Sequence, residues 1–127
     1  MTEIIYLGRL DTKILEAEFG KLGTDELIVT GERIEHIKKR HPEDYELFEV
    51  YGSLAAIKPD IILKDEKNEN TVFLIKRLDN TNLNVVARVI LERENSDLKN
   101  SVMTFYRIRS RNLLKLMEKN KILYKSE

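Results

Sequence analysis

The chain has 127 residues, with 22 Lys or Arg, 22 Asp or Glu, two His and no Cys. This length suits one domain, and 42% hydrophobic residues with only 5 Gly and 2 Pro exclude collagen-like and low-complexity chains. The lack of Cys excludes disulfide frameworks, thiolate zinc sites and Cys nucleophiles. No apolar run approaches the roughly 20 residues that span a bilayer, and the first residues lack signal-peptide features, so we expect a cytoplasmic protein without membrane contact.

The charges are divided unevenly along the chain although they cancel in total. Residues 1–70 carry 10 basic and 16 acidic side chains, a balance of −6, whereas residues 71–127 carry 12 basic and 6 acidic, a balance of +6. A basic half can present a cationic surface that attracts phosphate groups. The alternative is that the two halves pair with each other across the fold.

The first part of the chain gives weak local signals. Residues 3–8 are rich in β-forming side chains, and residues 11–19 suit a short helix or an irregular arm. Residues 26–30 are typical of a strand. We therefore expect residues 1–25 to form an N-terminal arm or edge strand, and residues 26–127 to form a single α+β domain.

Two helices are expected next, separated by a break at His41. Thr30 suits the N-cap of the first helix, which runs to about Arg40. Pro42 disfavours helical dihedral angles at His41 and is favoured at the first position of a helix. The second helix therefore begins at Pro42 and should end near Ala56.

The rest of the chain alternates between extended segments and polar turns. Four strands are expected, over residues 61–64, 71–78, 83–92 and 101–108. Ser110 suits the N-cap of a C-terminal helix, and residues 121–124 can add a short strand. We predict an α+β fold in which N-terminal helices pack on a four-stranded antiparallel β-sheet meander, with a C-terminal helix and one sheet face open to a ligand.

Both histidines fall in one short segment, at His36 and His41. Side chains five residues apart lie roughly 140° apart around a helix, whereas two zinc ligands four residues apart share a face, so we predict no metal site. At a helix end before a proline, the imidazole of His41 can be directed toward a neighbouring sheet. Both can also be ordinary surface histidines. Because glycine-rich phosphate loops and zinc-hydrolase motifs do not occur in the sequence, no cofactor is expected.

Cations and hydroxyl groups lie on the predicted strands. Strand alternation places Thr104 and Tyr106 on the same face of the last strand. The candidates for binding phosphate are Lys76, Arg88, Arg107 and Arg109. Basic side chains interleaved with Thr and Tyr on an antiparallel sheet suit RNA, since cations bind phosphate and an aromatic ring can stack on a base. The same side chains can equally be solvated charges.

The segment from Val29 to Pro42, with Lys58-Pro59-Asp60 downstream, resembles a phage-associated family of the barnase, EndoU, colicin and RelE nuclease superfamily. The likeness covers roughly residues 26–124 and rests on a Glu-Arg-x-x-His pattern at residues 32–36 and an Arg-His-Pro pattern at residues 40–42. It implies a metal-independent, toxin-like endoribonuclease encoded by a phage or mobile element. Its partners would be RNA and a cognate antitoxin or immunity protein.

The implied reaction is transesterification, in which a base deprotonates the RNA 2′-hydroxyl and an acid protonates the departing 5′-oxygen. The product carries a 2′,3′-cyclic phosphate. Histidine suits both roles because its ordinary pKa of about 6.5 allows either form near neutral pH. Carried over by position, the resemblance falls on His36, Arg40, His41 and Thr104. We expect proton transfer by His41 first and His36 second, a catalytic role for Thr104, and orientation by Tyr106 and Arg40.

Two other functions fit the same residues. The chain can be a catalytically inactive RNA-binding or partner-binding module of a mobile element. It can also be a phage structural or accessory protein, in which an aromatic helix face formed by Tyr45, Phe48 and Tyr51 contacts another subunit. The sequence leaves the oligomeric state and the RNA target open.

Overall fold

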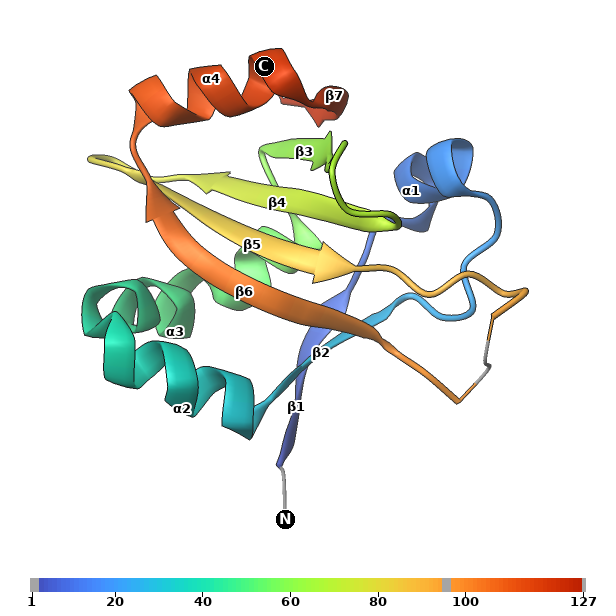
Figure 1. The fold of residues 1–127 in the computed structure, drawn as a ribbon, viewed down its shortest axis with the longest axis horizontal. Coiled ribbons are helices and arrows are strands. Elements are labelled where there is room, and N and C mark those ends of the chain that lie inside the picture. Colours follow the sequence, from blue (N-terminus) through green and yellow to red (C-terminus); the bar gives the residue numbers. More distant parts are fainter. Residues whose placement is uncertain (1–2, 95–96, 127) are drawn as a thin grey trace.

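The computed structural model describes residues 3–94 and 97–126, which form one sheet flanked by helices (Figure 1). The strands are β1 (Ile4–Arg9), β2 (Glu26–Thr30), β3 (Ile61–Lys64), β4 (Thr71–Arg77), β5 (Asn82–Arg88), β6 (Asn100–Ile108) and β7 (Lys121–Lys125). The helices are α1 (Thr12–Phe19), α2 (Gly31–Arg40), α3 (Pro42–Ile57) and α4 (Ser110–Lys119). None of the helices in these two ranges is both long enough and apolar enough to cross a membrane.

The sheet differs from the predicted one. Its seven strands lie in the order β1-β2-β6-β5-β4-β3-β7, and β2 pairs with β6 in parallel while the other neighbours are antiparallel. The prediction of a four-stranded antiparallel meander was therefore wrong. Strands β3 to β6 do pair in chain order, but β2 and β1 extend the sheet beyond β6, and β7 extends it beyond β3. These added pairings join segments that are far apart in sequence, so local hydrophobic patterns do not reveal them.

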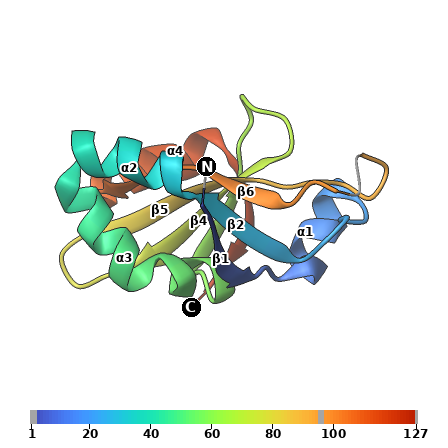
Figure 2. The same cartoon turned by 90° about the horizontal axis from the view of Figure 1, so that it is seen from below.

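One sheet face, which we call the α3 face, packs against α1 and α3 and forms the larger core. Figure 2 shows α2 and α3 toward one end of the sheet and α1 toward the other. Phe48 of α3 stacks on Phe105 of β6, with ring centroids 3.8 Å apart. Gly52 permits this stack, because a Cβ atom there would lie 2.9 Å from the Phe48 ring. Phe48 is thus a core residue, and its ring is not available to another subunit.

The opposite face, which we call the α4 face, is covered over only part of its area. Leu113 of α4 is buried there, and Leu116 and Met117 pack against the same apolar cluster, which includes Phe73 and Ile75. In Figure 1, α4 begins beyond the end of β6 and runs beside β3 toward β7. This face is therefore partly covered by a helix, whereas the sequence predicted an open face.

The start of α4 also differs from the prediction. Its N-cap is Arg109 and makes no side-chain capping hydrogen bond, so the expectation that Ser110 caps this helix was wrong. Ser110 is the first helical residue, and its hydroxyl lies 3.4 Å from the amide nitrogen of Asn82, which donates to it. The N-terminal end of α4 is therefore left without a side-chain cap.

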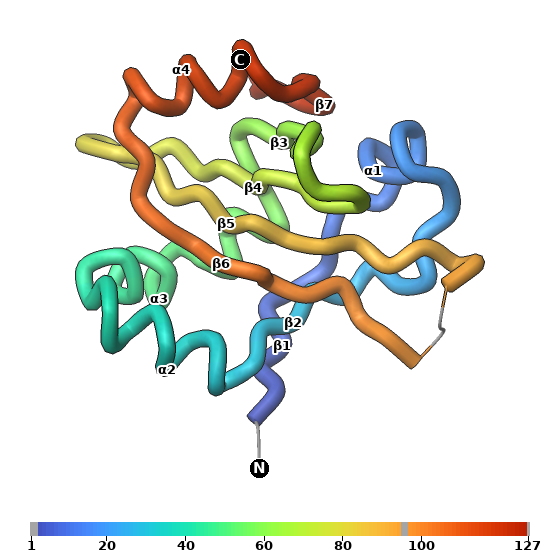
Figure 3. The backbone as a smooth tube through the Cα atoms, viewed as in Figure 1, coloured from blue at the N-terminus to red at the C-terminus, as the bar shows by residue number. Residues whose placement is uncertain are grey.

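The break between α2 and α3 follows the sequence prediction, and Figure 3 traces the chain through it. The hydroxyl of Thr30 caps α2 by accepting a hydrogen bond from the Arg33 N–H at 3.2 Å. Pro42 begins α3, and His41 between the helices has non-helical dihedral angles. The His41 carbonyl accepts the N–H of Asp44, which fixes the first turn of α3.

Candidate functional site

The predicted proton-transfer residues lie on the outer side of the helices. His36 and His41 are both exposed, and within residues 3–94 and 97–126 neither imidazole makes a hydrogen bond. His36 and Arg40 are four residues apart on α2, so they share one face of that helix. His41 instead precedes α3, three residues before Asp44. The structure therefore separates the two imidazoles, with one on the side of α2 and one at the start of α3.

Asp44 and Arg107 form the central contact of a polar hollow at the end of the sheet. The side-chain Nε atom of Arg107 donates to the Asp44 Oδ1 atom at 2.9 Å, and the backbone N–H of Arg107 donates to the same oxygen at 3.4 Å. The Asp44 side chain is 13% exposed and that of Arg107 is 49% exposed. We call this hollow of about 560 Å³ the arginine hollow, and its lining residues are Asp44, Asn80, Thr81, Arg107, Arg109 and Asn112.

The arginine hollow is positively charged. Two arginine side chains face one carboxylate, and Arg109 has no ion-pair partner among the residues that the structure describes. Asp44 lies in the first turn of α3 and Asn112 in the first turn of α4, so the positive ends of two helix dipoles lie at this hollow. Arginine side chains and the free N–H groups of a helix start are typical ligands of phosphate and other anions.

A second candidate pocket lies on the α4 face. We call it the groove; it has a volume of about 400 Å³, and its lining residues are Asn68, Glu69, Thr71, Val86, Arg88, Met103 and Thr104. Of the predicted site residues, Thr104 and Arg88 meet here. Arg88 is half-exposed, and its guanidinium lies 3.7 Å from Glu94, which is a loose ion pair.

Tyr106 lies one strand repeat from Thr104 on the same face of β6. Its hydroxyl accepts a hydrogen bond of 3.0 Å from the amide of Asn84, which is fully buried. Because the hydroxyl accepts from Asn84, its own hydrogen stays available to another acceptor. Tyr106 therefore sits half-buried on the α4 face, beside the groove in the direction of Arg109.

Lys76 lies apart from these sites. It points to the α3 face, the opposite face from Arg88, as strand alternation requires. Its ammonium group is 3.4 Å from a carboxylate oxygen of Asp60 and donates to the Lys58 carbonyl at 3.2 Å. The side chain is 16% exposed, so its charge is already neutralised inside the fold. Lys76 does not join the other predicted phosphate ligands.

Asp44, Asn80 and Asn112 line the arginine hollow but were not predicted as site residues. Asp44 carries no local signal, because its partner Arg107 lies 63 residues away, and its place in the first turn of α3 is explained by the helix dipole alone. Asn80 and Asn112 lie in a turn and in the first turn of a helix, where asparagine is common. Only the folded chain brings these three residues together.

The two oppositely charged halves of the chain pair in part. Eight ion pairs occur in the part of the chain that the structure describes, and five of them join a residue before position 71 to one after it. Lys99, for example, pairs with Glu26 at 2.6 Å, next to the parallel contact of β2 and β6. Pairing across the fold therefore neutralises several cations of the basic half, and Arg109 is one of those that stay unpaired.

No three His, Cys, Asp or Glu side chains within residues 3–94 and 97–126 gather closely enough to hold a metal ion. No family model, curated protein or solved structure matches this chain.

Proposed function

We propose that this protein is a metal-independent endoribonuclease that cuts RNA by attack of the 2′-hydroxyl on the adjacent phosphate. The observation that carries the proposal is the arginine hollow, which collects Arg107 and Arg109 at the start of two helices, one of them the helix that His41 precedes. The hollow offers positive charge to a phosphate, and His41 is the nearest histidine along the chain to its lining.

In the proposed reaction, the scissile phosphate binds between Arg107 and Arg109. The 2′-oxygen loses its proton to a base and attacks phosphorus, and the bond to the 5′-oxygen breaks as that oxygen takes a proton from an acid. The two arginines stabilise the charge that develops on the phosphate oxygens. His41 is the first candidate for proton transfer, and His36 is the second.

The proposed function also implies a cellular compartment and a protein partner. Cellular RNA lies in the cytoplasm, where a toxin-like ribonuclease of a phage or mobile element would act. A cell that makes such an enzyme would need a cognate antitoxin or immunity protein to block it. Both expectations belong to the same proposal and depend on RNA cleavage.

A second function, RNA binding without catalysis, is favoured by one observation. Catalytic histidines are commonly held in one tautomer and orientation by a hydrogen bond to the second ring nitrogen. In the described residues, neither His36 nor His41 has such a partner. A module that only binds RNA would use the arginine hollow in the same way and would need no oriented imidazole.

Cleavage of a labelled, mixed-sequence RNA in excess EDTA tests the proposal. We expect 2′,3′-cyclic phosphate ends from the wild type, and at least about a 100-fold slower reaction of the H41A variant, as expected for loss of a general acid or base. H36A is the matched control and should lose less activity, because His36 lies on the side of α2. RNA with 2′-O-methyl groups lacks the nucleophile and should stay intact.

The other outcomes are equally informative. Cleavage by H41A at the wild-type rate would remove His41 from the mechanism. RNA that stays intact, yet binds with an affinity that falls as salt rises, would support the binding module instead.

A further inference from the structure

The groove on the α4 face owes its shape to a β-bulge. The register of β5 and β6 shifts between Val86 and Ala87, where Val86 pairs with Thr104 but Ala87 pairs with Val102. Met103 is the extra residue. In a regular strand Met103 and Thr104 would point to opposite faces, whereas here both line the groove. Bulges of this kind redirect side chains and occur frequently beside binding sites.

The groove combines an apolar surface with polar groups at its edges. Val86 is 8% exposed and Met103 is 40% exposed, so together they present a hydrophobic surface that is partly open to solvent. Within residues 3–94 and 97–126 the Thr104 hydroxyl makes no hydrogen bond, and the loose Arg88 pair leaves N–H groups free. A flat ring with hydrogen-bonding groups around its edge fits such a site, since its faces are apolar and its edge is polar.

Strand β6 connects the groove to the arginine hollow. Thr104 lines the groove and Arg109 lines the hollow, five residues further on, which is roughly 16 Å at about 3.3 Å per strand residue. Tyr106 lies between them on the same face as Thr104, with its hydroxyl hydrogen free. Arg107 contacts Asp44 of α3 and so points to the opposite face, whereas Arg109 follows the last residue of β6. An RNA strand with one phosphate at Arg109 can therefore follow β6 past Tyr106 and reach the groove.

We infer that the groove is a nucleobase subsite, which selects the base of a nucleotide a short distance along the chain from the phosphate in the arginine hollow. The inference rests on the proposed RNA site. Val86 and Met103 contact the face of the base, and Thr104 and Arg88 bind its edge. The hollow supplies affinity for any RNA through charge, and the groove supplies the preference for sequence.

The test measures binding of four short 2′-O-methyl homopolymers, of A, C, G and U, which the proposed reaction cannot cleave. We expect the wild type to prefer one of the four. T104V removes the hydroxyl with little change of shape, and R88Q removes the charge at a half-exposed site, so each should fold normally. Each should reduce the ratio of the strongest to the weakest affinity by about fivefold, the effect of one hydrogen bond.

R109Q is the matched control, because it changes the hollow without touching the groove. It should weaken binding of all four homopolymers by the same factor and leave their ratio unchanged. Equal affinity of the wild type for all four, or a ratio that T104V and R88Q leave unchanged, would overturn the base subsite while leaving RNA binding intact. Failure of every homopolymer to bind, together with failure of unmodified RNA to bind, would overturn the proposed function and the subsite with it.

Discussion

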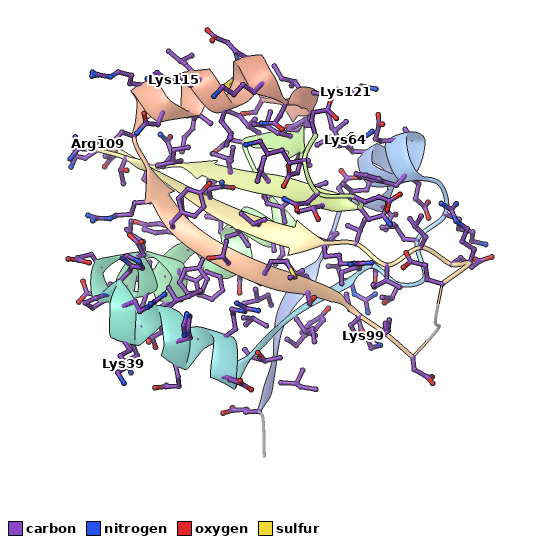
Figure 4. All side chains as sticks on the ribbon, in the orientation of Figure 1. Lys39, Lys64, Lys99, Arg109, Lys115 and Lys121 are labelled. Carbon is purple, nitrogen blue, oxygen red and sulfur yellow. The ribbon has the colours of Figure 1, made fainter. Side chains whose placement is uncertain are left out.

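Two carboxylates in this molecule, Glu18 and Asp44, pair with cations from distant parts of the chain. Both lysines that contact Glu18 are paired with it, whereas one arginine beside Asp44 is unpaired among the residues that the structure describes. Glu18 of α1 pairs through one oxygen with Lys64 at 3.0 Å and through the other with Lys121 at 2.6 Å. Asp44 pairs only with Arg107, and Arg109 beside it has no ion-pair partner in the described ranges. In Figure 4, Lys64 and Lys121 lie beside α1, whereas Arg109 lies at the opposite end of the sheet.

We therefore interpret the two clusters differently. The hydrogen bonds from Lys121 and then Lys64 lower the pKa of Glu18 and hold α1 against the β3–β7 edge, so we interpret this cluster as part of the fold. In the Asp44 cluster one arginine is paired and another is free beside a hollow of about 560 Å³. Arg109, which has no carboxylate partner in the described ranges, keeps its hydrogen-bond donors for a ligand.

The largest expected effect in this comparison is that of D44A. It removes the oxygen that holds Arg107 and a carboxylate from the first turn of α3, and we expect the free energy of unfolding to fall by about 2 kcal/mol. Urea unfolding measures this change. E43A is the matched control, since Glu43 is exposed in the same turn and only its interaction with the helix dipole is lost, about 0.5 kcal/mol.

D44A should at the same time bind RNA more tightly, because it releases the Arg107 guanidinium from its carboxylate. Equal destabilisation by D44A and E43A would mean that the contact with Arg107 contributes nothing to the fold. Weaker RNA binding by a folded D44A variant would mean that Asp44 positions Arg107 for RNA.

The next largest effect is on RNA affinity, which should depend on the Asp44 cluster but not on the Glu18 cluster. R109Q should weaken RNA binding by about tenfold at low salt, which corresponds to one charge-assisted hydrogen bond. The slope of log K against log salt should become shallower by about 0.7, the value for one phosphate contact with a single strand. K64Q removes a cation from the Glu18 cluster and should change neither quantity. Equal effects of R109Q and K64Q would contradict our assignment of the hollow as the phosphate site.

The smallest effect concerns the pH dependence of the Glu18 cluster. A lowered pKa in the folded state means that Glu18 stabilises the protein above its ordinary pKa of 4.5, and that this contribution is lost as the pH falls through the folded-state pKa. E18Q should therefore be less stable than the wild type by about 1 kcal/mol or less at pH 7, and the difference should vanish in acid.

Thermal unfolding of both proteins between pH 7 and pH 3 measures this difference. E46Q is the control, because Glu46 is exposed and has no ion-pair partner within residues 3–94 and 97–126, so its effect should stay small at every pH. A difference between E18Q and the wild type that persists in acid would show that the effect of Glu18 is not its charge.

Local residue patterns identified those features that are determined within a few residues. Thr30 caps α2, and Pro42 begins α3 after the break at His41, because capping and the fixed proline dihedral angle act over one helical turn. The same patterns failed at Ser110, where the helix begins one residue earlier than expected and has no side-chain cap. They also failed for the sheet, since strand alternation indicates a strand but does not indicate its neighbours.

The sequence indicated which residues belong to the candidate sites only by their type, and did not indicate which of them lie close together. Thr104 and Arg88, two separate candidates in the sequence, meet in the groove, but the β-bulge that adds Met103 has no signal in the sequence. Lys76 could not be recognised as neutralised, because its partner Asp60 lies in the link between α3 and β3.

By itself, the sequence determined the helix boundaries around His41, the presence of the four central strands and the unequal charge of the two halves, because these follow from local propensity and from counting. The third of these strands ends at Arg88 and not at residue 92. Only the tertiary structure decided which of those charges remain unpaired. Asp44 meets Arg107, and Asp60 meets Lys76, through contacts between elements that are distant along the chain. The free energy of such contacts depends on the packing of whole helices and strands, so no short segment encodes it.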